Sequence, residues 1–189
     1  MLKLAILGFL RDHPLHGYDL KKRVAALAGH VRPIADGTLY PTIKKLEDAG
    51  CLTRRTAPGS VSAPRHMLEV TQEGTDQLRR WLRDPEGVFI TDDNRWYILL
   101  AFLHHLENPA EQAIVLRRRL SFLDDEPVLF FDQEGRPLTS DRLEGPFRPG
   151  LVKIHRAGGG VEREWLAKLA GELERRAGLV PGVPHQSGD

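Results

Sequence analysis

Several features that mark particular classes of protein are scarce in this 189-residue sequence. Cys51 is the only cysteine, so no intramolecular disulfide can form and a reducing compartment is expected. The longest apolar run, near Trp96–Leu103, is far too short to cross a bilayer. There is no basic-then-apolar leader with a small-residue cleavage site, which argues against secretion. We therefore expect a cytoplasmic protein with no membrane partner.

Residue patterns typical of metal-binding, phosphate-binding or catalytic sites are scarce as well. His104 and His105 are adjacent, so on a helix their side chains would point about 100° apart and make a poor metal pair. The three glycines at 158–160 follow no expected strand and lack the Lys-Ser/Thr of a phosphate-binding loop. Cys51 has no evident histidine partner. We accordingly predict no enzyme, no cofactor and no metal site. A small enzyme or metal sensor is the alternative, which a bound-metal assay would reveal.

The net charge is only +1, but it is unevenly distributed. Residues 1–85 carry 14 Lys and Arg against 9 Asp and Glu, whereas residues 86–189 carry 13 against 17. A basic first half beside an acidic second half indicates that only the first half meets a polyanion. Chance clustering is the alternative that the charges alone leave open.

The spacing of apolar residues in the first half predicts three helices, at Leu2–Leu10, His16–Ala28 and Asp36–Gly50. Asp36 or Thr38 could cap the third helix, and Pro41 suits its first turn. Two short strands should follow, Cys51–Thr56 and Arg65–Val70, joined by the turn-rich link APGSVSAP. Thr71 then caps a fourth helix that ends near Arg83. This order of elements predicts a winged helix-turn-helix.

The second half reads as helical and follows a joint at residues 85–91. Asp92–Glu107 is apolar with helical spacing, Asn108 opens the next helix with a capping-box pattern, and Leu151–Arg176 forms the last one. Val128–Phe131, followed by Asp-Gln-Glu-Gly, fits a small hairpin within a segment, 126–150, that is rich in Pro, Gly and charge. The expected fold is mainly α, and its parts are a winged-helix domain (1–84), the joint, a helical dimerisation and effector domain (92–178) and a flexible tail (179–189).

The motifs LAILGFL, HPLHGYDLKKR, DGTLYPTIKKLEDAGCL and LEVTQEG together resemble the PadR family of bacterial transcriptional regulators. FLHHLENPAEQAIVLRRRL and VEREWLAKLAGELE look like the C-terminal helical domain of its longer-tailed branch, so that the resemblance covers about residues 1–176. It implies a winged helix that binds DNA, C-terminal helices exchanged between two subunits, and repression released by small molecules, often phenolics. The sequence departs from the family pattern at Leu68, where the wing strand usually carries an aromatic residue.

The resemblance and the charge pattern together point to DNA-binding residues on the third helix and the wing. The candidates are Thr38, Tyr40, Pro41, Lys44, Lys45, Arg54, Arg55, Arg65 and His66. Tyr40 and Lys44 are four residues apart on one helix and so point the same way. Lysine binds phosphate or a guanine edge, and Thr38 can donate to a phosphate. The alternative is a solvated face with a half-buried tyrosine. Tyr18, at the start of the second helix, is expected to pack against the third; the alternative is that His16–Tyr18 touch a phosphate.

The helices of the second half predict an obligate homodimer, because they carry more apolar surface than one small domain can hide. In relatives an aromatic residue at the start of the first C-terminal helix faces a cavity between subunits. The resemblance therefore assigns Trp96, Tyr97 and Leu100 to a small aromatic effector, with an ordinary core tryptophan as the alternative. Trp165 is expected in the dimer interface or the core. The glycines at 158–160 should lie in an uninterrupted helix, against a bulky partner such as the Trp96 helix of either subunit.

The function predicted from these observations is sequence-specific binding to a palindromic DNA operator by a homodimer, as a ligand-responsive repressor. The alternative is a winged-helix module that binds another protein and has no specific affinity for DNA. That alternative predicts no salt-dependent binding to a duplex.

Overall fold

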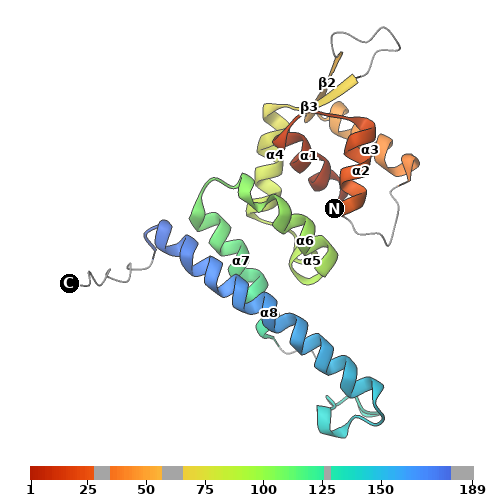
Figure 1. Cartoon of the computed structure of the whole chain (residues 1–189), viewed down its shortest axis with the longest axis vertical. Coiled ribbons are helices and arrows are strands. Elements are labelled where there is room, and N and C mark those ends of the chain that lie inside the picture. The colour runs from red at the N-terminus through yellow and green to blue at the C-terminus, as the bar shows by residue number, and fades with distance from the viewer. Residues whose placement is uncertain (28–34, 57–65, 126–128, 180–189) are drawn as a thin grey trace, which may run out of the picture. The chain divides into compact units, whose positions relative to one another are not determined.

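The computed structural model of the chain describes residues 1–27, 35–56, 66–125 and 129–179 (Figure 1). The chain divides into two compact units, Met1–Glu107 and Asn108–Asp189. The first holds a helical core and a small antiparallel sheet, and the second is built on two packed helices. Among the described residues, no helix has both the length and the apolar character that a membrane span requires.

The first unit starts with three helices and a short strand, which are α1 (Leu2–Asp12), β1 (Leu15–His16), α2 (Gly17–Leu27) and α3 (Asp36–Asp48). Their apolar stripes meet in one core, where Leu7, Leu20 and Leu39 are completely buried. The helix predictions for this region are confirmed to within a few residues. The strand β1 was not predicted, because two residues are too few to show an alternating pattern.

The start of α3 differs from the prediction. Its N-cap is Ala35, without a side-chain hydrogen bond, so neither Asp36 nor Thr38 caps it. Pro41 lies inside the helix rather than in its first turn, because the helix starts five residues earlier. Proline has no N–H, and the carbonyl of Gly37 therefore has no backbone donor four residues on. One residue further along, the Thr42 hydroxyl donates to the Thr38 carbonyl at 2.7 Å.

The wing is the hairpin of β2 (Leu52–Thr56) and β3 (His66–Val70), in register from Leu52 opposite Val70 to Thr56 opposite His66. The strand order is β1-β3-β2, so that β3 is the central strand. Leu68, which stands where the family pattern has an aromatic, is buried opposite Leu15 of β1. The predicted hairpin is confirmed within the described residues; Arg65 and the link before it lie outside them.

Thr71 joins the wing to α4 (Gln72–Arg83). Its hydroxyl accepts from the Gly74 N–H at 3.0 Å and donates to the Gly50 carbonyl at 2.6 Å. The predicted cap is therefore confirmed. A side chain at Gly74 would place its Cβ 2.8 Å from Val70 Cγ2 and closer still to the Cys51 carbonyl oxygen. Only glycine allows this close approach of α4 to the strand.

The rest of the first unit consists of α5 (Gly87–Thr91), α6 (Asp93–Phe102) and the 3₁₀ turn η1 (Leu103–His105). Phe102 packs over Gly8 of α1 and lies edge-to-face with Phe9, the ring centroids being 4.9 Å apart. This packing places residues 85–91 within the first unit, which ends at Glu107. The predicted domains 1–84 and 92–178, with a joint between them, stay a prediction. The predicted helix Asp92–Glu107 is correspondingly shorter.

The second unit consists of α7 (Pro109–Asp124), the 3₁₀ turn η2 (Ser140–Arg142) and the long α8 (Phe147–Arg176), with α7 and α8 side by side in Figure 1. The Asn108 side chain caps α7 by accepting from the Ala110 N–H at 2.9 Å, as the capping pattern predicted. Arg119 is only 1% exposed and meets Glu162 of α8 through two hydrogen bonds of 2.8 and 3.0 Å. Arg117 pairs with Glu174 in the same way near the end of α8.

The 30-residue helix α8 runs through the glycines at 158–160 without a break, as predicted, and starts four residues before Leu151. Within the second unit, a Cβ built on Gly158 or Gly160 meets nothing within 4 Å, and one on Gly159 meets only the Arg163 guanidinium. A bulky partner for this face therefore stays a prediction about a second subunit. Several apolar side chains of α8 lie exposed: Phe147, Leu151, Ile154, Val161 and Trp165.

The segment before α8 contains a tight turn. Phe131 forms an isolated antiparallel bridge with Pro137, and the Asp132 carboxylate accepts from the N–H groups of Glu134 and Arg136. Hydrogen bonds to its own turn and to the Arg136 side chain lower the pKa of Asp132, the Arg136 N–H having the largest effect. The turn lies at Asp132–Gly135, where the hairpin was predicted to turn. Val128 lies outside the described residues, as does the tail beyond Leu179.

Candidate nucleic-acid interface

The helix α3 has a buried face and an exposed face, as its sequence predicted. Leu39, Ile43 and Leu46 are buried in the core of the first unit. Four of the predicted DNA-binding residues are exposed on the rest of the helix: Thr38, Pro41, Lys44 and Lys45. Packing against the core consequently fixes which residues α3 presents to solvent.

Tyr40 is the fifth of these residues and has two environments. It is 45% exposed, yet a Cβ on Gly17 would lie 3.3 Å from its Cε1 atom, so the ring lies against the first turn of α2. Tyr18 was expected to make this contact between the second and third helices, but Tyr18 is 74% exposed. The contact between the two helices is instead made by Tyr40 of α3, whose ring lies over Gly17 of α2.

A second link between α2 and α3 is the ion pair of Lys21 and Asp36, with 2.7 Å between Nζ and Oδ1. The hydrogen bond to Asp36 raises the pKa of Lys21. Both side chains are partly or largely exposed, so the pair orients the first turn of α3 more than it stabilises the fold. Sequence reasoning missed this pair because its partners are separated by the loop after α2.

A groove of about 470 Å³ lies where α2, α3 and the wing meet. Its lining includes His16, Tyr18, Tyr40, Arg54 and His66. His16 Nδ1 is 3.2 Å from the His66 carbonyl oxygen, and this contact joins the paired strands β1 and β3. Aromatic and basic side chains from β1, α2, α3 and the two wing strands are thus brought together beside the exposed face of α3.

The two wing arginines described by the structure have different environments. Arg54 meets the carboxylate of Glu47 on α3 through two hydrogen bonds, one from Nε and one from Nη2 at 3.0 Å. The Glu47 hydrogen bond is the main reason that the pKa of Arg54 is raised. Arg55 has only a 3.5 Å contact with Glu69 and is largely exposed. The wing therefore presents Arg55 to solvent and uses Arg54 to hold α3.

Lys44, Lys45 and His66 complete the group of exposed basic residues. Lys44 Nζ is 3.4 Å from Asp48 Oδ1, one turn along the helix, and both groups are well exposed. Exposed pairs of this kind contribute little free energy, so a phosphate can replace the carboxylate at small cost. Arg65, the remaining predicted residue, lies outside the described part of the chain.

The three residues assigned to an effector do not lie in one environment. Trp96 is completely buried in the first unit, Leu100 is half-buried and Tyr97 is exposed. In the single chain, Trp96 is thus an ordinary core tryptophan, which was the alternative that its sequence position left open. An effector site that includes it stays a prediction.

The geometry assumed for His104 and His105 differs from the observed one, and whether they bind a metal stays a prediction. They lie in the 3₁₀ turn η1 rather than in a regular α-helix, and their ring centroids are only 4.0 Å apart. Asp12 of α1 lies against both rings. Sequence spacing could not reveal this cluster, because Asp12 is 92 residues from His104.

Comparison with known proteins finds a similarity within the first unit. Residues 6–80 match the family described as "Transcriptional regulator PadR-like family". The negative transcriptional regulator PadR of Bacillus subtilis (strain 168) is 35% identical over 82 residues, which are 43% of this chain and 45% of that protein. The match thus spans less than half the length of this curated relative.

Solved structures of similar proteins include B. subtilis PadR in complex with operator DNA and in complex with p-coumaric acid. The first is 23% identical and covers 90% of this chain and 98% of its own, with a TM-score of 0.43. The second is 22% identical and covers 92% and 98%, with a TM-score of 0.41. The PadR-like regulator BC1756 from Bacillus cereus is 18% identical, covers 91% and 95%, and has a TM-score of 0.39. Likeness of this degree carries no argument about ligands.

Proposed function

We propose that the chain is a member of the PadR-like family of transcriptional regulators, which residues 6–80 match, and that it represses transcription by binding a specific DNA operator. The observation that carries this proposal is the exposed face of α3, which sits beside a wing that carries further basic residues. The proposed site of action is the cytoplasm, and we propose no catalytic activity.

In this proposal the N-terminal half of α3 enters the major groove. The partial positive charge at a helix N-terminus attracts phosphate, and Thr38 can donate a hydrogen bond to one. Lys44 and Lys45 reach further along the groove, where a lysine can read the O6 and N7 atoms of guanine. Pro41 offers apolar contact and leaves no N–H that must find a partner.

The wing completes the proposed interface through backbone contacts to DNA. Arg55 and His66 lie exposed on neighbouring strands, and Arg65 continues β3 in the sequence. Contacts with phosphate contribute affinity without sequence information. Arg54, which is held by Glu47, is assigned the different task of fixing the wing against α3. This assignment replaces the direct DNA contact predicted for Arg54 from sequence.

We further propose that the protein is a homodimer. The exposed apolar side chains of α8 are its main support, since Val161 is 75% exposed and Ile154 and Phe147 are similarly open. A row of such residues on one helix is unusual for a surface that faces water. A second copy would cover this row and would present two copies of α3 to two halves of a palindromic operator.

A small aromatic effector is part of the same proposal. Its support is the resemblance to the PadR-like family that residues 6–80 carry. Of the three residues assigned to an effector here, Tyr97 is the one that a ligand can reach in the single chain. We propose that such a ligand favours a dimer in which the spacing of the two α3 helices no longer matches the operator.

Selection of duplexes from a random-sequence library by the purified protein, read by gel shift and sequencing, tests this function. We expect a palindromic sequence to be enriched over successive rounds at low salt. A winged-helix module for protein interaction is the alternative, and it predicts no enriched sequence. Failure to enrich any sequence at low salt would overturn the proposal.

A further inference from the structure

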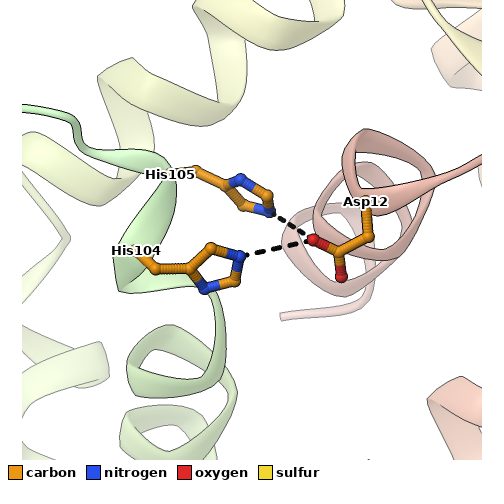
Figure 2. A group of neighbouring side chains, drawn as sticks. All are labelled: Asp12, His104 and His105. Atoms are coloured by element: carbon orange, nitrogen blue, oxygen red, sulfur yellow. Dashed lines mark hydrogen bonds and ion pairs between the residues drawn. The ribbon is translucent and has the colours of Figure 1, made fainter.

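Asp12, His104 and His105 form a compact group in the first unit (Figure 2). Asp12 is the last residue of α1, and the two histidines end η1. The Nε2 atoms of both histidines point to the same carboxylate oxygen, Asp12 Oδ1, and each is 3.3 Å from it. The three potential ligand atoms all lie within 4.8 Å of one another.

These distances fit a tetrahedral metal ion. Zinc binds imidazole nitrogen and carboxylate oxygen at about 2.0–2.2 Å, so two ligands of a tetrahedral site are separated by about 3.3–3.5 Å. The separations of Asp12 Oδ1 from the two nitrogens already have this length. The distance between the Nε2 atoms of His104 and His105 is the one that can differ from the tetrahedral value. Rotation of the exposed His104 ring can adjust it.

His105 is held in place as a ligand would need to be. Its side chain is 11% exposed, and its ring is stacked on Phe102 with an angle of 7° between the planes. A hydrogen bond with the Gly8 backbone also acts on the ring, and a backbone contact of this type commonly orients metal-binding histidines.

The Nε2 atom of His105 is buried and, within the described residues, has no hydrogen-bond partner of good geometry. An ordinary ion pair with Asp12 would leave this nitrogen poorly satisfied, whereas a metal ion would use its lone pair. The opposite side of the group is open, because the His104 side chain is well exposed and Asp12 is partly so. An ion can enter there, and water can complete its coordination.

We propose that Asp12, His104 and His105 bind one divalent transition-metal ion, of which zinc is the representative. Two imidazoles with one carboxylate favour zinc, nickel, cobalt or copper over magnesium and calcium, which prefer oxygen ligands alone. Such an ion ties the C-terminal end of α1 to η1, two residues before the first unit ends at Glu107. The site does not depend on the proposed DNA binding, and each can fail without the other.

Zinc binding to the full chain, measured by titration calorimetry after removal of metal with a chelator, tests this inference. We expect one ion per chain, and at least tenfold weaker binding in Asp12→Asn and in His104→Ala. His155→Ala, which removes an exposed histidine of α8, is the matched control and should bind zinc as the unchanged protein does. His105 is left intact because its ring packs on Phe102.

A second measurement separates specific binding from loss of folding. An ion that joins α1 to η1 binds the folded chain preferentially, so zinc should raise the melting temperature of the unchanged protein and of His155→Ala. It should leave Asp12→Asn and His104→Ala unaffected. If these two variants bind zinc as tightly as the unchanged protein, or if the unchanged protein binds none at micromolar concentrations, the site does not exist.

Discussion

The ion pair between Arg54 of the wing and Glu47 of α3 should control DNA binding without touching DNA. We expect Arg54→Ala and Glu47→Gln each to weaken binding to the selected operator, because either change frees the wing from α3. The Glu47 change is the sharper test, since it removes a negative charge beside a polyanion. Simple electrostatics would make binding to DNA tighter in that variant, so that weaker binding can only come from lost positioning.

The magnitude follows from the setting of the pair. Two hydrogen bonds join the groups, but the Arg54 side chain is half-exposed and solvent screens the attraction. Exposed pairs contribute about 0.2–1 kcal/mol, and good paired geometry places this one near the upper end, which corresponds to roughly fivefold in Kd. The double variant should bind about as weakly as either single variant, because both remove the same link.

Fluorescence anisotropy of the selected duplex, titrated at several salt concentrations, measures these effects. A positioning role leaves the dependence of log Kd on log salt unchanged in Arg54→Ala. A direct phosphate contact would lower that slope by about 0.9. Arg55→Ala is the matched control, because it removes the more exposed neighbouring arginine and should show the lower slope. Tighter binding by Glu47→Gln, together with a lower slope for Arg54→Ala, would refute the positioning role.

Three further predictions concern stability and assembly. Gly74→Ala should lower the free energy of unfolding, measured by urea titration, by on the order of 1–3 kcal/mol, because the new Cβ overlaps the Cys51 carbonyl. In the control Gly87→Ala the new Cβ meets nothing within 4 Å, and the loss should be far smaller. Arg119→Met should destabilise the second unit by about 3 kcal/mol, because it leaves Glu162 largely buried without its partner, whereas Arg117→Met should cost at most about 1 kcal/mol. Equal losses for the two arginines would contradict this difference. Light scattering should give twice the 21.3 kDa of one chain, and Val161→Asp should give a single chain; a monomer mass for the unchanged protein at micromolar concentration would exclude the dimer.

The winged helix was predictable because its signals are local. The spacing of Leu39, Ile43 and Leu46 fixes which face of α3 is buried, and Thr71 is a cap whose partner lies three residues away. A helix period and a side-chain cap both act within a few residues, where sequence spacing reports geometry directly.

Features that depend on distant contacts were not predictable. The two-residue β1 exists only because β3 pairs with it, and α6 belongs to the first unit because Phe102 packs over Gly8. The role proposed for Arg54 depends on its ion pair with Glu47 of α3. Nothing in the sequence indicates that these two charged residues are partners. Each of these features is set by tertiary packing, which propensity and periodicity do not encode.

The measurement that tests the central account most directly is the affinity of the selected operator for a variant of the α3 face. Lys44→Ala with Lys45→Ala should weaken specific binding by roughly 1–3 kcal/mol for each lysine that contacts a base, and should reduce the preference for the operator over unrelated DNA. Lys153→Ala with Lys168→Ala removes the same charge from the exposed surface of α8 and should leave the preference unchanged. Equal effects of the two pairs, or an unchanged preference in the α3 variant, would contradict the conclusion that this face reads DNA.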